Sequence, residues 1–272
     1  MPIITLLTDF GTHDTYVAIM KGVILKINPQ ATIVDITHWI DPQDLCQAAY
    51  TIAGSYRYFP ADTVHIVVVD PGVGSRRAIV ALRLEGQTIL APDNGVLSPF
   101  LEKEPIEKIV KVENTDYFLK PVSRTFHGRD VFAPVGAQLS LGLPLDRLGA
   151  QIQSDTLVRL DFVQPRLEKN GRVSGTVIDI DRFGNLITNI DWPFVKRRYP
   201  AAGKDTLRFA IGRHNLNCLS PTYDSVKPGN PLVLIGSRGL FEISVNQGNA
   251  ARFFSARTGT SITLWIDNPL DG

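Results

Sequence analysis

VHIVVVDPGVG (residues 64–74) holds a run of apolar and β-branched side chains that ends on Asp70 and continues into a Pro-Gly turn. An uninterrupted run of this kind is typical of a strand that is buried on both faces. An aspartate at the end of such a strand either accepts hydrogen bonds from the following turn or faces a ligand. The run therefore predicts a buried strand and leaves two possible roles for Asp70.

The residues on either side of this run alternate between strand and helix patterns. Further strands are expected at IITLLTDF (3–10), TIVDITH (32–38), AIVALRL (78–84) and TILAPDNG (88–95), and helices at 16–27, at 42–59 and near DVFAPVGAQLSLG (130–142). Strands that alternate with helices in this way predict an α/β domain with a mostly parallel central sheet.

The pattern changes after about residue 150, where short strands separated by Gly, Asn and Pro replace the alternation. These strands are RVSGTVIDID (172–181), NLITNID (185–191), TLRFAIG (206–212), PLVLIGS (231–237), LFEISVN (240–246) and SITLWI (261–266). The boundary is expected in the polar stretch between Gln151 and Gly171. We expect an α/β domain at residues 1–160 and an all-β domain at residues 161–272.

Composition excludes several classes of protein. The chain has 272 residues, 44% of them hydrophobic, and a formal net charge of +1 with acids and bases interspersed. We therefore expect no nucleic-acid partner, since nucleic-acid binding needs a basic stripe. No apolar run is long enough for a membrane span, and the first residues lack the basic start of a signal peptide. Together with only two cysteines, Cys46 and Cys218, these features predict a cytoplasmic protein with free thiols and no membrane partner.

Three strands of the first domain end on an acid or an amide, namely Asp9, Asp70, and the pair Asp93 and Asn94. The carboxyl ends of parallel strands share one edge of a sheet, where ligands bind, so these side chains are candidates for one pocket. The alternative is that each side chain only supports its own turn. The glycine-rich stretch DPGVG (70–74) matches neither the dinucleotide-binding fingerprint nor the phosphate-binding loop, so we expect no phosphate site.

Three other stretches carry side chains suited to ligand binding. They are TFHGRD (125–130) with His127, IDRFGN (180–185) with Asp181, Phe183 and Asn185, and GSRG (236–239) with Ser237 and Arg238. Arginine beside serine in a turn is suited to bind a carboxylate. Each stretch has a structural alternative, because a lone histidine is usually packed, Phe-Gly-Asn forms turns, and an arginine in a turn is usually a surface charge.

Taken in order, the motifs TDFGTHDTYV, VVVDPGVGSRR, TFHGRD, IDRFGNLITNI and SRG…SVNQGNA resemble those of the S-adenosyl-L-methionine hydrolase family, also called S-adenosylmethionine hydroxide adenosyltransferases. The resemblance extends from about residue 3 to 268. It implies an α/β domain followed by a β-barrel, and a homotrimer whose sites lie between subunits. The implied reaction is displacement of methionine from C5′ of S-adenosylmethionine by water, which yields adenosine and L-methionine.

The resemblance also assigns roles to residues by motif. The implied catalytic set is Asp70, Arg77 and His127. The implied substrate contacts are Asp9 (at the ribose hydroxyls) and Phe10 in the first domain, Phe183 and Asn185 at adenine, and Asp181, Ser237 and Arg238 around the methionine amine and carboxylate. A sulfonium is a good leaving group, so the reaction needs in-line positioning and an activated water. No metal-ligand cluster is apparent, and we expect neither a metal nor another cofactor.

The S-adenosyl-L-methionine hydrolase family is related to the bacterial fluorinase and chlorinase, and the chain departs from these halogenating enzymes in a way that favours water. Those relatives have a tyrosine at the position of Asp70, and the fluorinase has a threonine at the position of Val73. A carboxylate beside the nucleophile site would repel a halide but accept a hydrogen bond from water. Which group takes the proton of that water stays open, because a neighbouring Arg77 makes Asp70 a weaker base.

Two other functions remain possible at this point. Asp9, Asp70 and His127 could belong to a metal-dependent hydrolase, since acids at strand ends can hold Mg²⁺ or Zn²⁺. The chain could also be a non-catalytic protein that binds S-adenosylmethionine or adenosine, although such a protein would not need the catalytic set. We therefore expect a hydrolase that acts on S-adenosylmethionine.

Overall fold

The computed structural model describes residues 2–103, 105–200 and 202–266. Contacts divide the chain into two compact units, Met1–Asp161 and Phe162–Gly272. Each unit has its own hydrophobic core, with Phe132 among the buried side chains of the first core and Phe209 and Phe241 among those of the second. The two units are therefore described separately.

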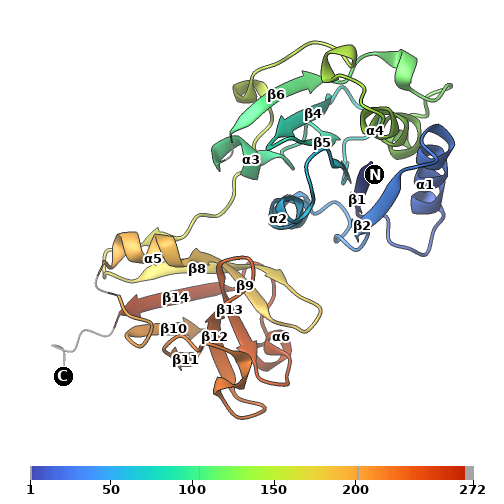
Figure 1. The fold of residues 1–272 in the computed structure, drawn as a ribbon. Coiled ribbons are helices and arrows are strands. Elements are labelled where there is room, and N and C mark those ends of the chain that lie inside the picture. The colour runs from blue at the N-terminus through green and yellow to red at the C-terminus, as the bar shows by residue number, and fades with distance from the viewer. Residues whose placement is uncertain (1, 104, 201, 267–272) are drawn as a thin grey trace. The chain divides into compact units, whose positions relative to one another are not determined.

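The first unit contains a six-stranded sheet in the order β2-β1-β3-β5-β4-β6 (Figure 1). Its strands are β1 (Ile3–Thr8), β2 (Thr32–Thr37), β3 (Val64–Val68), β4 (Ile79–Leu84), β5 (Gln87–Pro92) and β6 (Ile106–Lys111). The neighbours from β2 to β5 pair in parallel, whereas β4 is antiparallel to both β5 and β6. This mostly parallel sheet confirms the expected α/β class.

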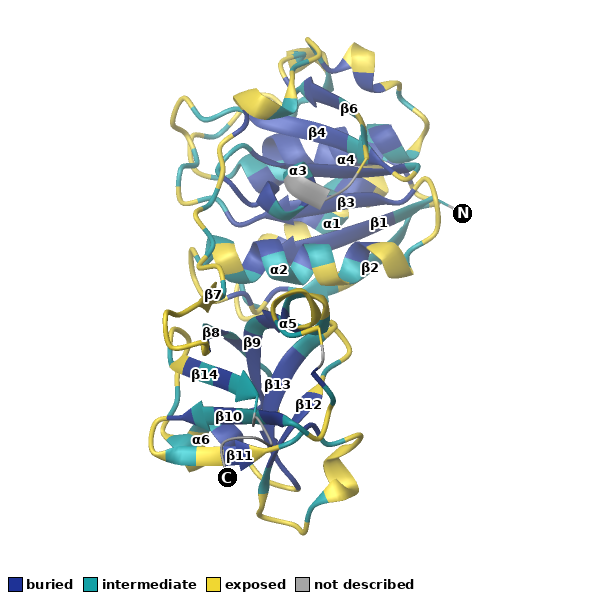
Figure 2. Ribbon diagram, turned by 90° about the vertical axis from the view of Figure 1, so that its left-hand side faces the viewer, coloured by how far each residue is buried: buried dark blue, intermediate teal, exposed yellow. Residues whose placement is uncertain are grey.

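Helices cover both faces of this sheet. They are α1 (Tyr16–Ile27), α2 (Leu45–Ser55), α3 (Ser98–Lys103) and α4 (Ala133–Ser140), and a π-helical turn, Gly128–Phe132, leads into α4. Figures 1 and 2 show α1 and α4 on one face and α2 and α3 on the other. Coverage of both faces is the reason that all five residues of β3 are buried and four of them are apolar.

The second unit is an antiparallel sheet in the order β11-β10-β14-β8-β9-β13-β12, with β7 paired to β8. Its elements are β7 (Arg166–Leu167), β8 (Val173–Ile180), β9 (Leu186–Asp191), α5 (Trp192–Arg198), β10 (Leu207–Ile211), β11 (His214–Asn217), β12 (Pro231–Ile235), β13 (Leu240–Val245), α6 (Ala250–Phe254) and β14 (Ser261–Ile266). The two end strands, β11 and β12, contact each other, so the sheet is nearly closed. The expected all-β, barrel-like fold is confirmed.

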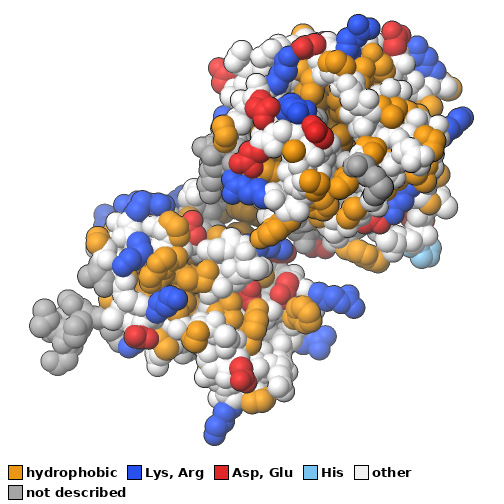
Figure 3. Space-filling view, in the orientation of Figure 1, with side chains coloured by type: hydrophobic (Ala, Val, Ile, Leu, Met, Phe, Trp, Pro, Cys, Tyr) orange, Lys and Arg blue, Asp and Glu red, His pale blue; other side chains and the backbone are white. Residues whose placement is uncertain are grey.

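Several expectations drawn from composition can be compared with this structure. Cys46 and Cys218 are free thiols. On the face drawn in Figure 3, basic and acidic side chains are interspersed. Among the described residues, no helix combines the length and apolar character that a membrane span requires.

His65 is a fully buried polar residue at the centre of the first sheet. Its Nδ1 lies 2.7 Å from Thr5 Oγ1 on β1, and its Nε2 lies 2.7 Å from Gln87 Oε1 on β5. The Gln87 amide nitrogen donates to the Phe59 carbonyl, so Gln87 Oε1 accepts from His65 Nε2 and the Thr5 hydroxyl donates to Nδ1. The neutral ring is fully paired, and burial lowers the pKa of His65 to about 4.

This buried histidine predicts a loss of stability in acid. The pKa of His65 is 6.5 in its ordinary state and about 4 in the folded chain, so between these values the unfolded state binds the extra proton. The free energy of unfolding should therefore fall as the pH decreases from 6.5, by about 3 kcal/mol at pH 4. Urea unfolding at several pH values should give a shallower pH dependence for His65→Gln than for the wild type. Equal slopes for the two proteins would contradict the prediction.

Candidate active site

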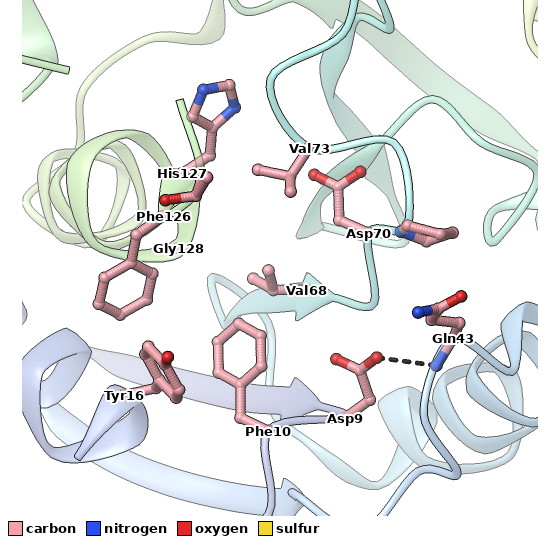
Figure 4. Close-up of a pocket in the computed structure, with 12 residues that line it drawn as sticks. Asp9, Phe10, Tyr16, Gln43, Val68, Asp70, Val73, Phe126, His127 and Gly128 are labelled. Carbon is pink, nitrogen blue, oxygen red and sulfur yellow. Dashed lines mark hydrogen bonds between the residues drawn. The ribbon is translucent and has the colours of Figure 1, made fainter. Parts of the chain in front are cut away.

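A pocket of about 390 Å³ opens at the carboxyl ends of β1 and β3 (Figure 4). These strands are parallel neighbours, and Thr8 of β1 is in register with Val68 of β3. Asp9 and Asp70 follow the two strands, so both carboxylates reach the same edge and line the pocket. This part of the expected strand-end cluster is present.

Asp70, Arg77 and His127 form one hydrogen-bonded chain. Arg77 Nε donates to both Asp70 oxygens at 3.0 and 2.9 Å, and Arg77 Nη2 also donates to Asp70 Oδ2. The same Nη2 lies 2.7 Å from His127 Nδ1. The Asp70 and Arg77 side chains are only 4% and 9% exposed. A guanidinium can only donate, so His127 Nδ1 accepts, and the neutral ring carries its proton on Nε2.

The surroundings of His127 favour this neutral form. Burial, followed by the positive charge of Arg77, lowers the pKa of His127, while Asp70 and Asp130 act in the opposite direction. A hydrogen bond to the Ser123 backbone also raises this pKa, but the lowering effects of burial and Arg77 prevail. His127 is therefore a neutral acceptor that orients the Arg77 guanidinium.

Two local features bring Arg77 and His127 together. Gly74 has φ +77°, and a Cβ at this position would collide with the Arg124 carbonyl oxygen. Glycine thus lets the turn after β3 lie directly against the segment before His127. That segment is fixed by the buried Asp130, which accepts from the Ser123 N–H at 2.7 Å and from Arg129 Nε at 2.6 Å. This role of Asp130 was not predicted from the sequence.

The loop after β1 is anchored by buried polar groups. Thr8 Oγ1 accepts a hydrogen bond from the Phe10 N–H at 3.2 Å and lies 2.9 Å from His38 Nδ1. The His38 carbonyl accepts from the Gly11 N–H at 2.7 Å. Thr8 and His38 therefore hold the backbone on both sides of Asp9. The role of His38 was not predicted, since its contacts join the segments at the ends of two separate strands, β1 and β2.

One oxygen of Asp9 is already engaged by the protein. Asp9 Oδ2 accepts a hydrogen bond from the Gln43 backbone N–H at 2.9 Å, which is the dashed line in Figure 4. The other oxygen is directed away from Gln43, towards the pocket. Asp9 therefore presents one fixed acceptor to a ligand.

The remaining wall of the pocket is apolar and aromatic. The rings of Phe10, Tyr16 and Phe126 pack against one another with centroids 5.0 to 6.1 Å apart. Val68 and Val73 line the space between these rings and the two acids. The pocket thus offers carboxylate acceptors on one side and apolar contact on the other, which suits an organic ligand with hydroxyl groups.

Asp93 and Asn94 do not line this pocket, and the expectation that they would join it is wrong. Asp93 Oδ1 accepts a hydrogen bond from the Val158 N–H at 2.9 Å. The Asn94 amide donates to the Val69 carbonyl at 2.9 Å, and its oxygen accepts from the Val96 N–H. Asn94 therefore supports its turn, as in the alternative reading, whereas Asp93 anchors the distant segment at Val158.

In the second unit, Asp181, Phe183 and Asn185 form a tight turn between β8 and β9. Asp181 Oδ1 accepts from the N–H groups of Phe183 and Asn185, and Oδ2 accepts from the Asn185 side-chain amide, all at 2.9 Å. The turn buries Asn185 and leaves Phe183 75% exposed. It therefore presents an aromatic ring that is open to a ligand or partner.

Ser237 and Arg238 lie in the exposed turn between β12 and β13. Arg238 Nη1 donates to Asp179 Oδ2 at 2.8 Å, and the Asp179 side chain is 9% exposed. The arginine is thus paired with a carboxylate of the protein itself. Asp179 was not predicted as a partner of Arg238, although alternation along β8 places it on the same buried face as Val177.

Comparisons with known proteins cover both units. The model for the SAM hydroxide adenosyltransferase N-terminal domain matches residues 4–149, and the model for the C-terminal domain matches residues 175–263. A Salinispora arenicola protein named (R)-S-adenosyl-L-methionine hydrolase is 36% identical over 266 residues, which is 97% of each chain. A protein from an Actinoplanes species named fluorinase is 31% identical over 291 residues, again 97% of each chain.

A solved structure supports the same relationship. The crystal structure of an uncharacterized conserved protein from Thermotoga maritima matches with a TM-score of 0.88 and 37% sequence identity. The match covers 96% of this chain and 99% of that chain. The family expected from the motifs is confirmed, and the chain belongs to the S-adenosyl-L-methionine (SAM) hydroxide adenosyltransferase family.

Proposed function

We propose that this protein hydrolyses S-adenosyl-L-methionine to adenosine and L-methionine. The main support is the position of the Asp70 carboxylate after the carboxyl end of β3. Asp70 lines the pocket, and Arg77 holds it by hydrogen bonds to both carboxylate oxygens. The name of the Salinispora arenicola relative supports the same activity. The roles of individual residues below are part of the proposal.

In the proposed reaction, a water oxygen attacks C5′ of the substrate from the side opposite the sulfur. The new O–C5′ bond forms as the C5′–S bond breaks. The electron pair of the C5′–S bond returns to sulfur, which gives neutral methionine. No general acid is needed for this leaving group, because a sulfonium loses its charge on departure. The protein must hold the water in line and accept its proton.

Asp70 is the proton acceptor in this scheme. His127 Nδ1 already accepts from Arg77, and the His127 ring is also bonded to the Ser123 backbone. Neither Arg77 nor the engaged nitrogen of His127 is free to take a proton. Arg77 and His127 therefore act by fixing the direction of the Asp70 carboxylate, and the proton passes from water to Asp70 and then to solvent.

The other motif residues are proposed to bind the substrate. Asp9 accepts from the ribose hydroxyls through its pocket-facing oxygen, and Phe10 contributes to the apolar wall. In the second unit, Phe183 and Asn185 contact adenine, while Asp181, Ser237 and Arg238 bind the methionine amine and carboxylate. A guanidinium has five donors, so Arg238 can bind a substrate carboxylate while it remains paired with Asp179.

The central test is product analysis in ¹⁸O-labelled water. Incubation with S-adenosylmethionine should yield methionine and adenosine that carries ¹⁸O at its 5′ position, as detected by liquid chromatography and mass spectrometry. S-adenosylhomocysteine is the matched control, since its neutral thioether is a poor leaving group and should stay intact. Unlabelled adenosine would contradict attack at C5′, and the absence of both products would contradict the proposed function.

The two acids should have separable roles. Asp70→Asn keeps the shape of the side chain but removes the proton acceptor, so the single-turnover rate should fall about 10²- to 10⁴-fold with little change in substrate affinity. Asp9→Asn should instead weaken adenosine binding by about tenfold or more, because it loses a hydrogen bond to a charged acceptor. Calorimetry and rapid-quench kinetics measure the two effects. Equal losses of affinity in both variants would refute this division.

We also propose that the protein is a homotrimer, as the family resemblance implies. We expect its sites to be shared between subunits, because the implied substrate contacts lie in both units. Light scattering should then give three times the 30.0 kDa mass of one chain. Asp70→Ala and Asn185→Ala should each be inactive, but mixed subunits should recover part of the activity, since some shared sites contain both native residues. A monomeric mass, or no recovery after verified subunit exchange, would argue against shared sites.

A further inference from the structure

Gln43 has an unusual backbone conformation at the edge of the pocket. The Asp44 N–H donates to the Asp41 carbonyl at 2.9 Å, Pro42 occupies the second position of the turn, and Gln43 occupies the third with φ +67°. These are the features of a type II turn, whose third position favours glycine. A side chain at this position strains the backbone.

Neither the turn nor the helix that follows needs the glutamine side chain. Asp44 caps α2 by accepting from the Gln47 N–H at 2.8 Å. The hydrogen bond to Asp9 comes from the Gln43 backbone, and glycine would supply the same N–H group. Glycine could therefore make every structural contact of this turn without the backbone strain that the glutamine side chain causes.

The Gln43 side chain lines the pocket. Figure 4 shows its amide on the same side of the pocket as the Asp9 and Asp70 carboxylates. Within the described ranges of the chain, this amide has no hydrogen-bond partner in the protein. Gln43 is exposed, so its amide is accessible to a ligand that enters the pocket. Strained backbone at a pocket edge is a reason to look for a functional contact.

The chemistry of a ribose explains what such an amide would add. Each hydroxyl of a vicinal diol both donates and accepts, whereas an ionised carboxylate only accepts. The free oxygen of Asp9 can therefore accept hydrogen bonds from the hydroxyl groups but cannot donate to the hydroxyl lone pairs. The Gln43 amide supplies N–H donors beside this acceptor.

We propose that Gln43 is a further substrate-binding residue, which recognises the ribose diol together with Asp9. Its backbone N–H holds one oxygen of Asp9, so that the other oxygen is directed to one hydroxyl, and its side-chain amide donates to the neighbouring hydroxyl. The site is thereby selective for ribonucleosides over deoxyribonucleosides. This inference rests on the proposed function, since it takes the adenosine part of the substrate as the ligand.

Gln43→Gly tests the inference because it keeps the backbone N–H, relieves the strain and removes only the amide. The melting temperature should stay the same or rise, while the Kd for adenosine in calorimetry should increase about fivefold. Titrations with 2′-deoxyadenosine and 3′-deoxyadenosine identify the contact. The effect of the substitution should disappear for the analogue that lacks the hydroxyl bound by Gln43. Unchanged adenosine binding, or an equal effect on all three nucleosides, would overturn the proposal.

Glu85→Gly is the matched control. Glu85 is an exposed residue with φ +48° in the turn between β4 and β5, and it does not belong to the pocket lining. Its replacement should leave nucleoside binding unchanged. The two proposals fail in different ways: a wild-type protein that neither binds adenosine nor cleaves S-adenosylmethionine refutes both. A wild-type protein that does both, with no adenosine effect of Gln43→Gly, refutes only the role of Gln43.

Discussion

The ion pair between Asp70 and Arg77 is the interaction on which the candidate site depends. Both side chains are almost completely buried, and Arg77 contacts both carboxylate oxygens. Loss of one partner would leave a buried charge without compensation, which costs about 3–5 kcal/mol. Since Arg77 also donates to His127, the pair joins the turn after β3 to the π-helical turn at Gly128–Phe132. One interaction therefore fixes both the Asp70 carboxylate and the segment with His127, which line the same pocket.

The parts of this arrangement that follow from local pattern could be predicted from the sequence. The apolar runs predicted β1 and β3, and the parallel class of the sheet predicted that Asp9 and Asp70 would reach one edge. Strands with mixed polarity, β6 (IEKIVK) and β11 (HNLN), were not predicted, because their sequences lack a continuous apolar run. The helix expected at 42–59 begins instead at Leu45, since the preceding turn and the Asp44 cap exclude the earlier residues.

The contacts that could not be predicted join residues far apart in the chain or involve the backbone. Asp93 is held by the backbone of Val158, a partner that no local pattern reveals. The Gln43 contact to Asp9 also comes from a backbone N–H group, so the residue type carries no signal for it. Asp130 belongs to the TFHGRD motif, but its hydrogen bond to Ser123 depends on the path of the intervening loop. Motif order was therefore a better guide to the family than to these supporting contacts.

The charge balance at Asp70 bears on which nucleophile the proposed reaction can use. Arg77 and Asp70 form a pair with no net charge, so the guanidinium is not available to attract an anion. Val73 offers no hydroxyl, and a halide that entered this space would lose its hydration without a replacement donor. Water, in contrast, can donate a hydrogen bond to the Asp70 oxygen and reach the reacting carbon with its lone pair. The same carboxylate that accepts the proton in the proposed reaction therefore also disfavours a halide in place of water.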